Sequence, residues 1–466
     1  MKSNKLNRRG FLAAVGGASS AVVLAACAPT PPAKPETITI KETVVVEKSV
    51  EKIVVATAPA VPDLGLTLKI GVVIPLTGDS AEPGQAWNEA VKVAVDYISE
   101  TAESTGVSKQ LTIVLSDSQD SEGSPVRGVE AAKKLVTVDG VQAIMGDFYS
   151  SVTSAFAKAV AIPNKVLVFT GGTNAKLTAL NGAGATFLWQ PCPADDLQAT
   201  VLVAYMSKTF GETSKINIGY RNDAYAAGLA TTFKESWEAQ GGTIPQFVVY
   251  QPDQVTFDTE AQQLVADTPD GWLIVDFCEP FQKLRGPLER TGKWEGARTF
   301  GGDAMRGCGG GGDATSAEST PERRAKGIVG LRTTGANVSS GSSFADFEKL
   351  YIAKKSPKVN FLSFTAEIFD SVFVVYLAAL AAKSIDTTEI SRQVTAVTNA
   401  PAQEYDFTKL DQAMAALMRG EKIHFVGASG PLNFAAGGRV GAAIYDVDQT
   451  GADGVDVHID LFEMAG

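Results

Sequence analysis

Histidine and cysteine are scarce in this chain of 466 residues, which holds two histidines and four cysteines. His424 and His458 both lie late in the chain beside apolar or strand-like stretches, which favours structural roles. The spacing of the cysteines matches no zinc site. The sequence also lacks a Gly-x-Ser-x-Gly nucleophile elbow and a Walker phosphate loop, since the glycine run at 309–312 has no Gly-Lys-Ser/Thr ending. We therefore predict no catalysis, no metal site and no cofactor, so that the protein is not an enzyme.

Basic residues are outnumbered: 41 lysines and arginines stand against 52 aspartates and glutamates, and the net charge is −11. Such a surface repels nucleic acid and anionic lipid headgroups, so we predict no nucleic-acid partner. Adjacent acids arise cheaply in so acidic a chain, and the pair Asp195 and Asp196 predicts the start of a helix. Long apolar runs are missing too. The most apolar stretch, Ser363 to Ala382, is interrupted by Glu367 and Asp370 and predicts a buried helix rather than a membrane span.

The first residues are typical of a bacterial export signal. Paired arginines, Arg8 and Arg9, precede a short apolar run at 11–26 that contains glycines and ends in a small-residue box before cysteine. The arginines resemble a twin-arginine signal, with Sec export as the alternative, and the Leu-Ala-Ala-Cys box resembles a lipobox. We predict that residues 1–26 are removed and that a lipid on Cys27 anchors the protein to the outer side of the cell membrane.

The remaining chain divides into a tether and two α/β runs. Residues 27–66 are rich in proline and charge, which is the composition of an extended linker. From residue 67 apolar strands alternate with amphipathic helices, a pattern that predicts parallel sheets covered on both faces. A break at 190–196 separates the two runs, and the length suits two lobes. The expected strands are residues 68–74, 111–115, 143–145, 166–170, 215–220, 247–250 and 272–277, and the expected helices are residues 85–99, 124–138, 151–161, 226–240, 259–268 and 279–291.

Hydroxyls, glycines and one acid follow three of the expected strands. Ser150 and Ser151 come after the strand that ends at residue 145, Gly171 and Thr173 come after the next strand, and Asp303 follows a strand near residue 299. In open parallel sheets ligands bind beyond the carboxyl ends of the strands, against helix N-termini. Hydroxyls and free N–H groups suit a carboxylate, and an acid suits a cation. Plain helix capping by either serine is the alternative.

The order of these segments resembles the substrate-binding proteins of branched-chain amino acid ABC transporters, which are type I periplasmic binding proteins. The resemblance covers roughly residues 68–466. It rests on the segments Ile70–Gly78 with Gly84-Gln85, Gly146–Thr153, Thr173–Thr178, Pro193–Gln198, Asp223–Tyr225 and Gly302-Asp303.

This resemblance implies an α/β fold of two doubly wound parallel-sheet lobes joined by three crossovers, near residues 192, 332 and 428. The N-terminal lobe would comprise residues 67–192 plus 333–427. The C-terminal lobe would comprise residues 193–332 plus 428–466.

The resemblance also implies roles for single residues. Ser150 and Thr173 would hold a ligand carboxylate, with the backbone around Gly171, and Asp303 would hold the ammonium group where the family often has glutamate. Tyr225 would be a closing aromatic from the second lobe. The remaining residues implied at the ligand are Ser151, Tyr149 and Phe277, and a disulfide between Cys278 and Cys308 is also implied.

We therefore expect an extracytoplasmic, lipid-anchored solute-binding protein that captures a small zwitterion, an aliphatic or aromatic amino acid, by lobe closure. Its partner would be an ABC transporter permease, to which it delivers the ligand. One alternative is a ligand sensor of the same fold for amides, urea or aromatic carboxylates. Another is an extracytoplasmic hydrolase, for which the sequence offers no visible nucleophile and base.

Overall fold

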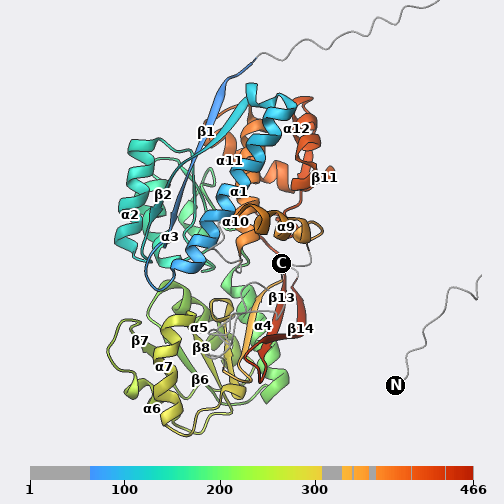
Figure 1. The fold of residues 1–466 in the computed structure, drawn as a ribbon. Coiled ribbons are helices and arrows are strands. Elements are labelled where there is room, and N and C mark those ends of the chain that lie inside the picture. The colour runs from blue at the N-terminus through green and yellow to red at the C-terminus, as the bar shows by residue number, and fades with distance from the viewer. Residues whose placement is uncertain are drawn as a thin grey trace, which may run out of the picture. The chain divides into compact units, whose positions relative to one another are not determined.

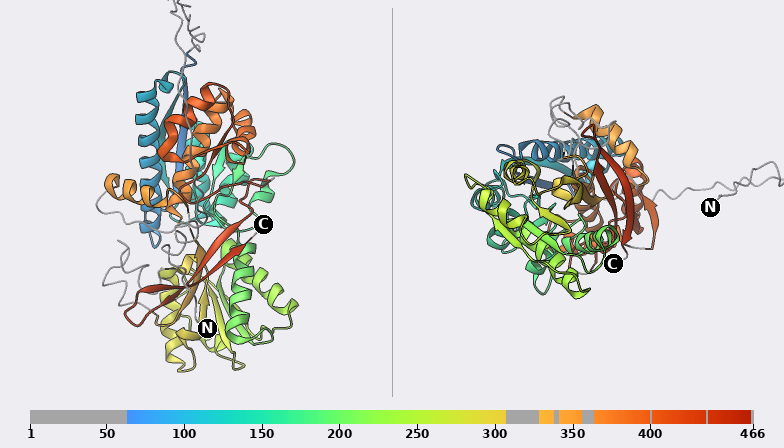
Figure 2. Two further views of the ribbon diagram at one scale, coloured as in Figure 1. Left: turned by 90° about the vertical axis from the view of Figure 1, so that its right-hand side faces the viewer. Right: turned by 90° about the horizontal axis from the view of Figure 1, so that it is seen from below.

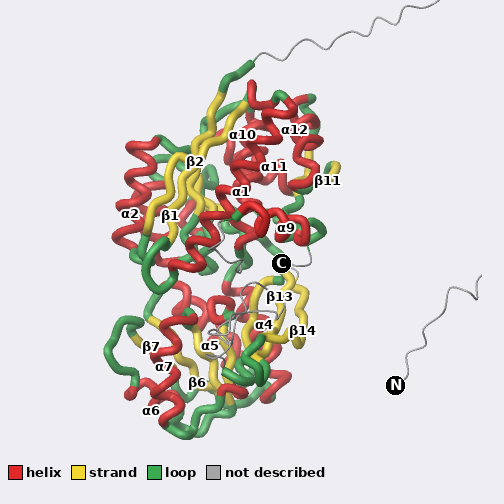
Figure 3. The backbone as a smooth tube through the Cα atoms, viewed as in Figure 1, coloured by secondary structure: helices red, strands yellow, loops and turns green. Residues whose placement is uncertain are grey.

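The computed structural model describes residues 63–306, 328–337, 341–355, 364–399, 401–435 and 437–464. The leader, Cys27, nearly all of the tether, the glycine run at 309–312 and Cys308 lie outside the described residues, so the expectations that concern them stay predictions. Two large β-sheets with helices on their faces, and a small two-stranded sheet, form the described part (Figures 1 and 3).

The first sheet is parallel and has the strand order β2-β1-β3-β4-β5. Alternate residues of its strands enter different cores. Ile70 and Val72 pack with the helices at 81–105 and 365–382, whereas Val73 and Ile144 pack with the helices at 125–134 and 150–156. This alternation follows from the two-residue period of a strand and explains why both faces need helices. The strands are β1 (Leu66–Ile74), β2 (Leu111–Asp120), β3 (Ala143–Met145), β4 (Leu167–Phe169) and β5 (Leu188–Trp189).

The helices of this lobe come from two separate stretches of the chain. The first stretch supplies α1 (Ala81–Thr105), α2 (Pro125–Lys134) and α3 (Ser150–Phe156), with π-helical turns at Leu135–Asp139 and Ala157–Ala161 that continue the last two. The second stretch supplies α9 (Phe344–Lys354), α10 (Thr365–Ala382), α11 (Thr387–Thr398), α12 (Leu410–Met418) and the small parallel pair β11 (Gln403–Tyr405) and β12 (Ile423–Phe425).

Helix α10 confirms the prediction of a buried apolar helix. Among the described residues it is the one helix long and apolar enough to cross a membrane, with a mean hydropathy of 1.6, and 89% of it is buried inside the protein. The acids that interrupt it are buried as well. Asp370 accepts hydrogen bonds from the N–H groups of Ala428 and Ser429, both at 2.8 Å, and from the Ser429 hydroxyl at 2.6 Å. One of these acids therefore fastens a distant loop to the helix.

The second sheet has the order β14-β13-β10-β9-β8-β6-β7. Its parallel strands are β6 (Ile216–Arg221), β7 (Phe247–Tyr250), β8 (Gly271–Val275), β9 (Thr299–Gly301) and β10 (Arg332–Ala336). Helices α4 (Asp195–Phe210) and α5 (Ala224–Ala239) pack on one face, and α6 (Asp258–Leu264) and α7 (Cys278–Arg290) pack on the other.

The second sheet is parallel except at one edge. Strand β13 (Ala443–Thr450) pairs antiparallel with β10, and β14 (Asp456–Met464) pairs antiparallel with β13 (Figure 2). A short turn joins these two strands, so no helix intervenes and the chain must reverse direction.

Two crossovers lie further along the chain than the resemblance implies. Strand β10 belongs to the second sheet, so the second crossover follows residue 336 rather than lying near 332. Leu432, Phe434 and Val440 still pack in the core of the first lobe, so the third crossover lies just before β13 rather than near 428. The physical reason is a backbone link: the N–H of Gln190 donates to the Gly438 carbonyl at 2.7 Å, and the Val440 N–H donates to the Gln190 carbonyl at 3.2 Å.

Candidate ligand-binding site between the lobes

The loops after β3 and β4 lie side by side in the first lobe. Ser150 begins α3 and is buried, and its Oγ accepts a hydrogen bond from the Asn174 N–H at 3.2 Å. A Cβ on Gly172 would meet the Cα of Ser150 at 3.1 Å, which shows how closely the two loops approach. Gly171 is held against an indole instead, since a Cβ there would lie 1.8 Å from the ring of Trp87.

The same loops contact the second lobe. The Thr173 carbonyl accepts a hydrogen bond from the Asp195 N–H at 2.8 Å. The Asn174 side chain donates to the Ala224 carbonyl at 2.5 Å, at the start of α5. Gly228 on the next turn of that helix leaves room for this amide, because a Cβ there would lie 2.4 Å from it. The lobes are therefore in contact at the carboxyl ends of the first sheet's strands.

Two buried carboxylates lie on the second lobe's side of this contact. Asp303 follows β9, is 8% exposed, and accepts a hydrogen bond from the Tyr225 hydroxyl at 2.7 Å. Asp195 is 1% exposed, and the Thr173 side chain lies near enough to lower its pKa, although neither carboxylate oxygen has a hydrogen-bond partner within 3.5 Å among the described residues. Burial raises the pKa of both acids, and the nearby charge of Asp303 raises the pKa of Asp195 further, well above its ordinary value.

Sequence reasoning missed Asp195 as a site residue. The helix does begin there, as the acid pair predicts, but the two acids diverge. The Asp196 carboxylate forms an ion pair with Arg439 at 2.7 Å and stays partly exposed, whereas Asp195 is enclosed. The one available signal was that the pair falls inside a segment carrying the family resemblance, Pro193 to Gln198.

A row of aromatic rings runs across the lobe contact. The ring of Tyr149 in the first lobe lies 4.6 Å from that of Phe277, which in turn lies 5.6 Å from Tyr225. On the other side Phe148 is 5.1 Å from Tyr149 and 5.4 Å from Trp87. The rings from the two lobes thus form one apolar wall beside the buried acids.

Arg221 lies over this wall and was not anticipated from the sequence. Its guanidinium is 4.9 Å from the ring centroid of Phe277 and 5.6 Å from that of Tyr149. It pairs with Asp223 at 2.6 Å and with Asp276 at 3.9 Å, and it is 11% exposed. Burial nevertheless raises the pKa of Asp276 to about 7. The guanidinium charge is thus already paired with two acids of the same lobe, Asp223 and Asp276.

The structure brings most of the expected residues together. Tyr149, Phe277, Tyr225 and Asp303 form a chain of successive contacts. Ser150 and Thr173 lie beside this chain of contacts, since Ser150 is hydrogen-bonded to Asn174 and Thr173 is hydrogen-bonded to Asp195. Ser151 is half-buried in the first turn of α3.

The cysteines and the possible metal ligands complete the description. Cys278 is disulfide-bonded and Cys192 is a free, buried thiol. Cys308 lies outside the described residues, so its pairing with Cys278 stays a prediction. Within the described ranges no group of three or more His, Cys, Asp or Glu side chains is placed to hold a metal ion.

Comparison with known proteins identifies relatives by sequence. The family model of the periplasmic binding proteins matches residues 67–424. The Leu/Ile/Val-binding protein BraC3 of Rhizobium johnstonii is 31% identical over 196 residues, which cover 42% of this chain and 51% of that protein. A Leu/Ile/Val-binding protein homolog 3 of Brucella melitensis is 27% identical over 197 residues, with the same coverage. The chain thus matches about half the length of these relatives.

Solved structures share the fold. The leucine-binding protein LivK of Thermotoga maritima superimposes with a TM-score of 0.66 at 19% identity, over 85% of this chain and 98% of that one. LivJ of Streptococcus pneumoniae, solved with isoleucine, gives 0.64 at 19% identity, over 86% and 100%. A solute-binding protein of R. palustris, solved with 4-hydroxybenzoate, gives 0.62 at 16% identity, over 86% and 98%. With a family model that spans most of its length and the two-lobed type I fold, the chain belongs to the periplasmic binding protein family.

Proposed function

We propose that this protein is an extracytoplasmic solute-binding protein that captures an α-amino acid with an aliphatic or aromatic side chain and delivers it to an ABC permease. The observation that carries the proposal is the pair of buried acids, Asp195 and Asp303, at the lobe contact. Anchoring through a lipid on Cys27 is part of the same proposal.

A cation would stabilise Asp195 and Asp303 in their ionised forms. A carboxylate that is removed from water without a partner costs several kcal/mol, so these side chains either keep a proton or meet a positive charge. Arg221 is engaged with Asp223 and Asp276 and does not supply this cation. A ligand ammonium carries three donors, enough for the carboxylates of Asp195 and Asp303 together.

The first lobe offers hydrogen-bond donors for the carboxylate of a zwitterionic ligand. The hydroxyls of Ser150 and Thr173 and the N–H groups at the start of α3 together suit a ligand carboxylate. The rings of Tyr149 and Phe277 then offer an apolar surface for the side chain. Since the two charged ends of the ligand would be held by different lobes, binding stabilises the closed arrangement that a permease could recognise.

A second candidate ligand is an aromatic carboxylate such as the one bound by the R. palustris relative. The aromatic row with Arg221 stacked on it favours this class. Such a ligand has no ammonium, however, and would leave Asp195 and Asp303 unpaired. The acids therefore favour the amino acid.

Matched ligands test the choice. Leucine, isoleucine and phenylalanine are titrated calorimetrically beside 4-methylpentanoate, which lacks the amine, leucinamide, which lacks the carboxylate, and 4-hydroxybenzoate. The proposal expects binding of an amino acid and a loss of at least about 30-fold for either truncated analogue, the equivalent of about 2 kcal/mol for one unpaired buried charge. Tight binding of 4-hydroxybenzoate with no response to any amino acid would reject the proposal.

A further inference from the structure

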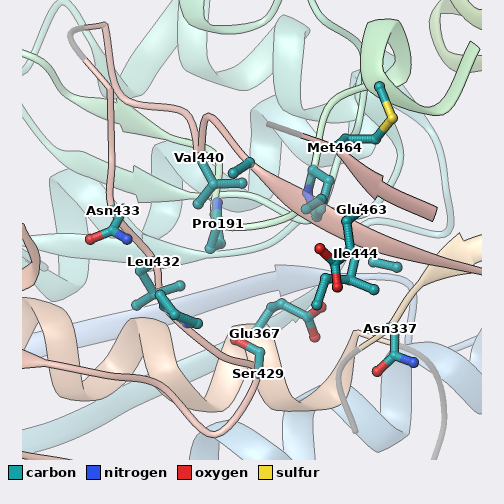
Figure 4. A pocket seen from close by; sticks show the side chains of 15 residues that line it. Pro191, Asn337, Glu367, Ser429, Leu432, Asn433, Val440, Ile444, Glu463 and Met464 are labelled. Carbon is teal, nitrogen blue, oxygen red and sulfur yellow. The ribbon is translucent and has the colours of Figure 1, made fainter. Parts of the chain in front are cut away.

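A separate cavity lies where the three crossovers meet (Figure 4). Its volume is about 540 Å³, within the range of small-molecule sites. Pro191 and Pro193 of the first crossover, residues 336–337 of the second and residues 442–444 around the third all line it. The residues assigned above to the amino acid do not line it, so this hinge pocket is distinct from the site between the lobes.

Two carboxylates face each other across the hinge pocket. Glu367 stands in the first turn of α10 in the first lobe, and Glu463 stands on β14 in the second, and Figure 4 shows their side chains pointing toward one another. Glu367 is 2% exposed, and its Oε2 has no hydrogen-bond partner among the described residues. The nearby Ser429 hydroxyl does not donate a hydrogen bond to Glu367, because it donates to Asp370 instead.

The rest of the lining is largely apolar and includes Leu432, Val440 and Ile444. A compact organic cation would suit both the carboxylates and the apolar lining, since its charged end can pair with the carboxylates while its body contacts the aliphatic side chains. A metal ion is a poorer match, because the described residues offer no cluster of three ligating side chains here.

We propose that the hinge pocket binds a small alkylammonium compound, with Glu367 and Glu463 as its counter-ions. The site does not depend on the amino-acid function proposed above. One ammonium would bridge an acid from each lobe, directly beside the segments about which the lobes move.

Protonation of Glu367 should make amine binding in the hinge pocket depend on pH. Burial raises the pKa of Glu367 to about 8. The charged groups around it are Asp370 on its own helix, which raises this pKa, and Arg306 after β9, which lowers it; Glu463 faces it from β14. Cys192 on the first crossover also lies within electrostatic reach. A bound ammonium needs ionised Glu367, so its affinity should fall up to about tenfold per pH unit below about pH 8 and level off above it.

The test uses n-butylammonium chloride, titrated calorimetrically into the mature protein up to about 50 mM, with 1-butanol as a neutral probe of the same shape. We expect saturable binding of the amine, no comparable binding of the alcohol, and the pH dependence described above. Glu367→Gln should weaken amine binding at least tenfold. Glu463→Gln, on a more exposed strand position, should also weaken it, and it gives a second reading if the buried substitution disturbs folding.

Glu421→Gln is the control, since Glu421 is exposed and paired with Arg419, and this variant should bind the amine as the parent protein does. Equal binding by the parent and both pocket variants would overturn the proposal, as would no binding of the amine or equal binding of 1-butanol. Loss of binding in Asp303→Asn with full retention in Glu367→Gln would place the amine between the lobes and overturn it as well.

Discussion

Glu367 carries a stability penalty that should be removable by one isosteric substitution. The folded protein holds this carboxyl at a pKa of about 8, against an ordinary value of 4.5, because burial penalises the charged form. Since the folded state binds the proton more tightly than the unfolded chain, the free energy of unfolding decreases as the pH rises from about 4.5 to about 8, and then stays level. Glutamine has the same shape and no proton to lose, so Glu367→Gln should escape this decline.

The size of the gain follows from the two pKa values. Each pH unit between them is worth about 1.4 kcal/mol, so the variant should exceed the parent by about 1 kcal/mol at pH 5, about 3 kcal/mol at pH 7 and between about 4 and 5 kcal/mol at pH 8.5. Asp370, whose pKa burial raises to about 6, titrates in the same window but is present in both proteins, so most of its contribution cancels in the difference.

Urea denaturation at these three pH values measures the effect. Two lobes need not unfold together, so tryptophan fluorescence and far-ultraviolet circular dichroism should be followed in parallel. Glu421→Gln, which removes an exposed acid, should show no gain that grows with pH. A gain for Glu367→Gln that is the same at pH 5 and pH 8.5, or a loss that deepens with pH, would refute the reasoning, because both require that Glu367 is already stabilised as an anion.

Three further outcomes are expected. Asp303→Asn should weaken amino-acid binding by at least about 30-fold in calorimetry, because it removes one counter-ion of a buried ammonium, whereas Asp196→Asn, the control, should bind as the parent does; unchanged affinity in Asp303→Asn would contradict the assignment. Cys27→Ala should release the protein from membranes into the soluble fraction, and a variant that still pellets after a high-salt wash would place the anchor elsewhere. A bound amino acid at a hundredfold excess over its dissociation constant should raise the free energy of unfolding by about 2.7 kcal/mol and reduce the radius of gyration in small-angle scattering; stabilisation without compaction would exclude closure.

Local periodicity sufficed for most of the elements. The buried strand that ends at Ile74 and the helix from Gln85 to Ser99 were both predicted, because a parallel sheet covered on two faces has strong local patterns. The burial of α10 was also predictable, since Glu367 and Asp370 leave too short an apolar run for a membrane span. The positions after the expected strands indicated Ser150, Thr173 and Asp303, and the resemblance to a known family then implied their roles.

The parts that were missed depend on contacts between distant segments. Nothing near Val440 indicates that it remains in the first lobe, because the backbone hydrogen bond that holds it there is made with Gln190. Asp195 looked like an ordinary first-turn acid, and its isolation arises only when Thr173 and Gly228 close around it. Arg221 likewise could not be identified from its neighbours in sequence, because its contacts are with the rings of Tyr149 and Phe277, which lie far from it in the chain.

The discontinuous first lobe has a consequence for how the chain folds. The Tyr376 hydroxyl donates to the Leu111 carbonyl at 3.1 Å across 265 residues of sequence, and Val440 belongs to the same core as Leu68. A growing chain therefore cannot complete its first lobe until nearly the last strand has been synthesised, whereas the middle of the chain already holds most of the second sheet. Such long-range closure is slow and leaves the apolar faces of β1 and α1 exposed in the meantime. We therefore expect the second lobe's parallel sheet to form before the first lobe is complete, and the half-built first lobe to be the segment that a chaperone would have to protect.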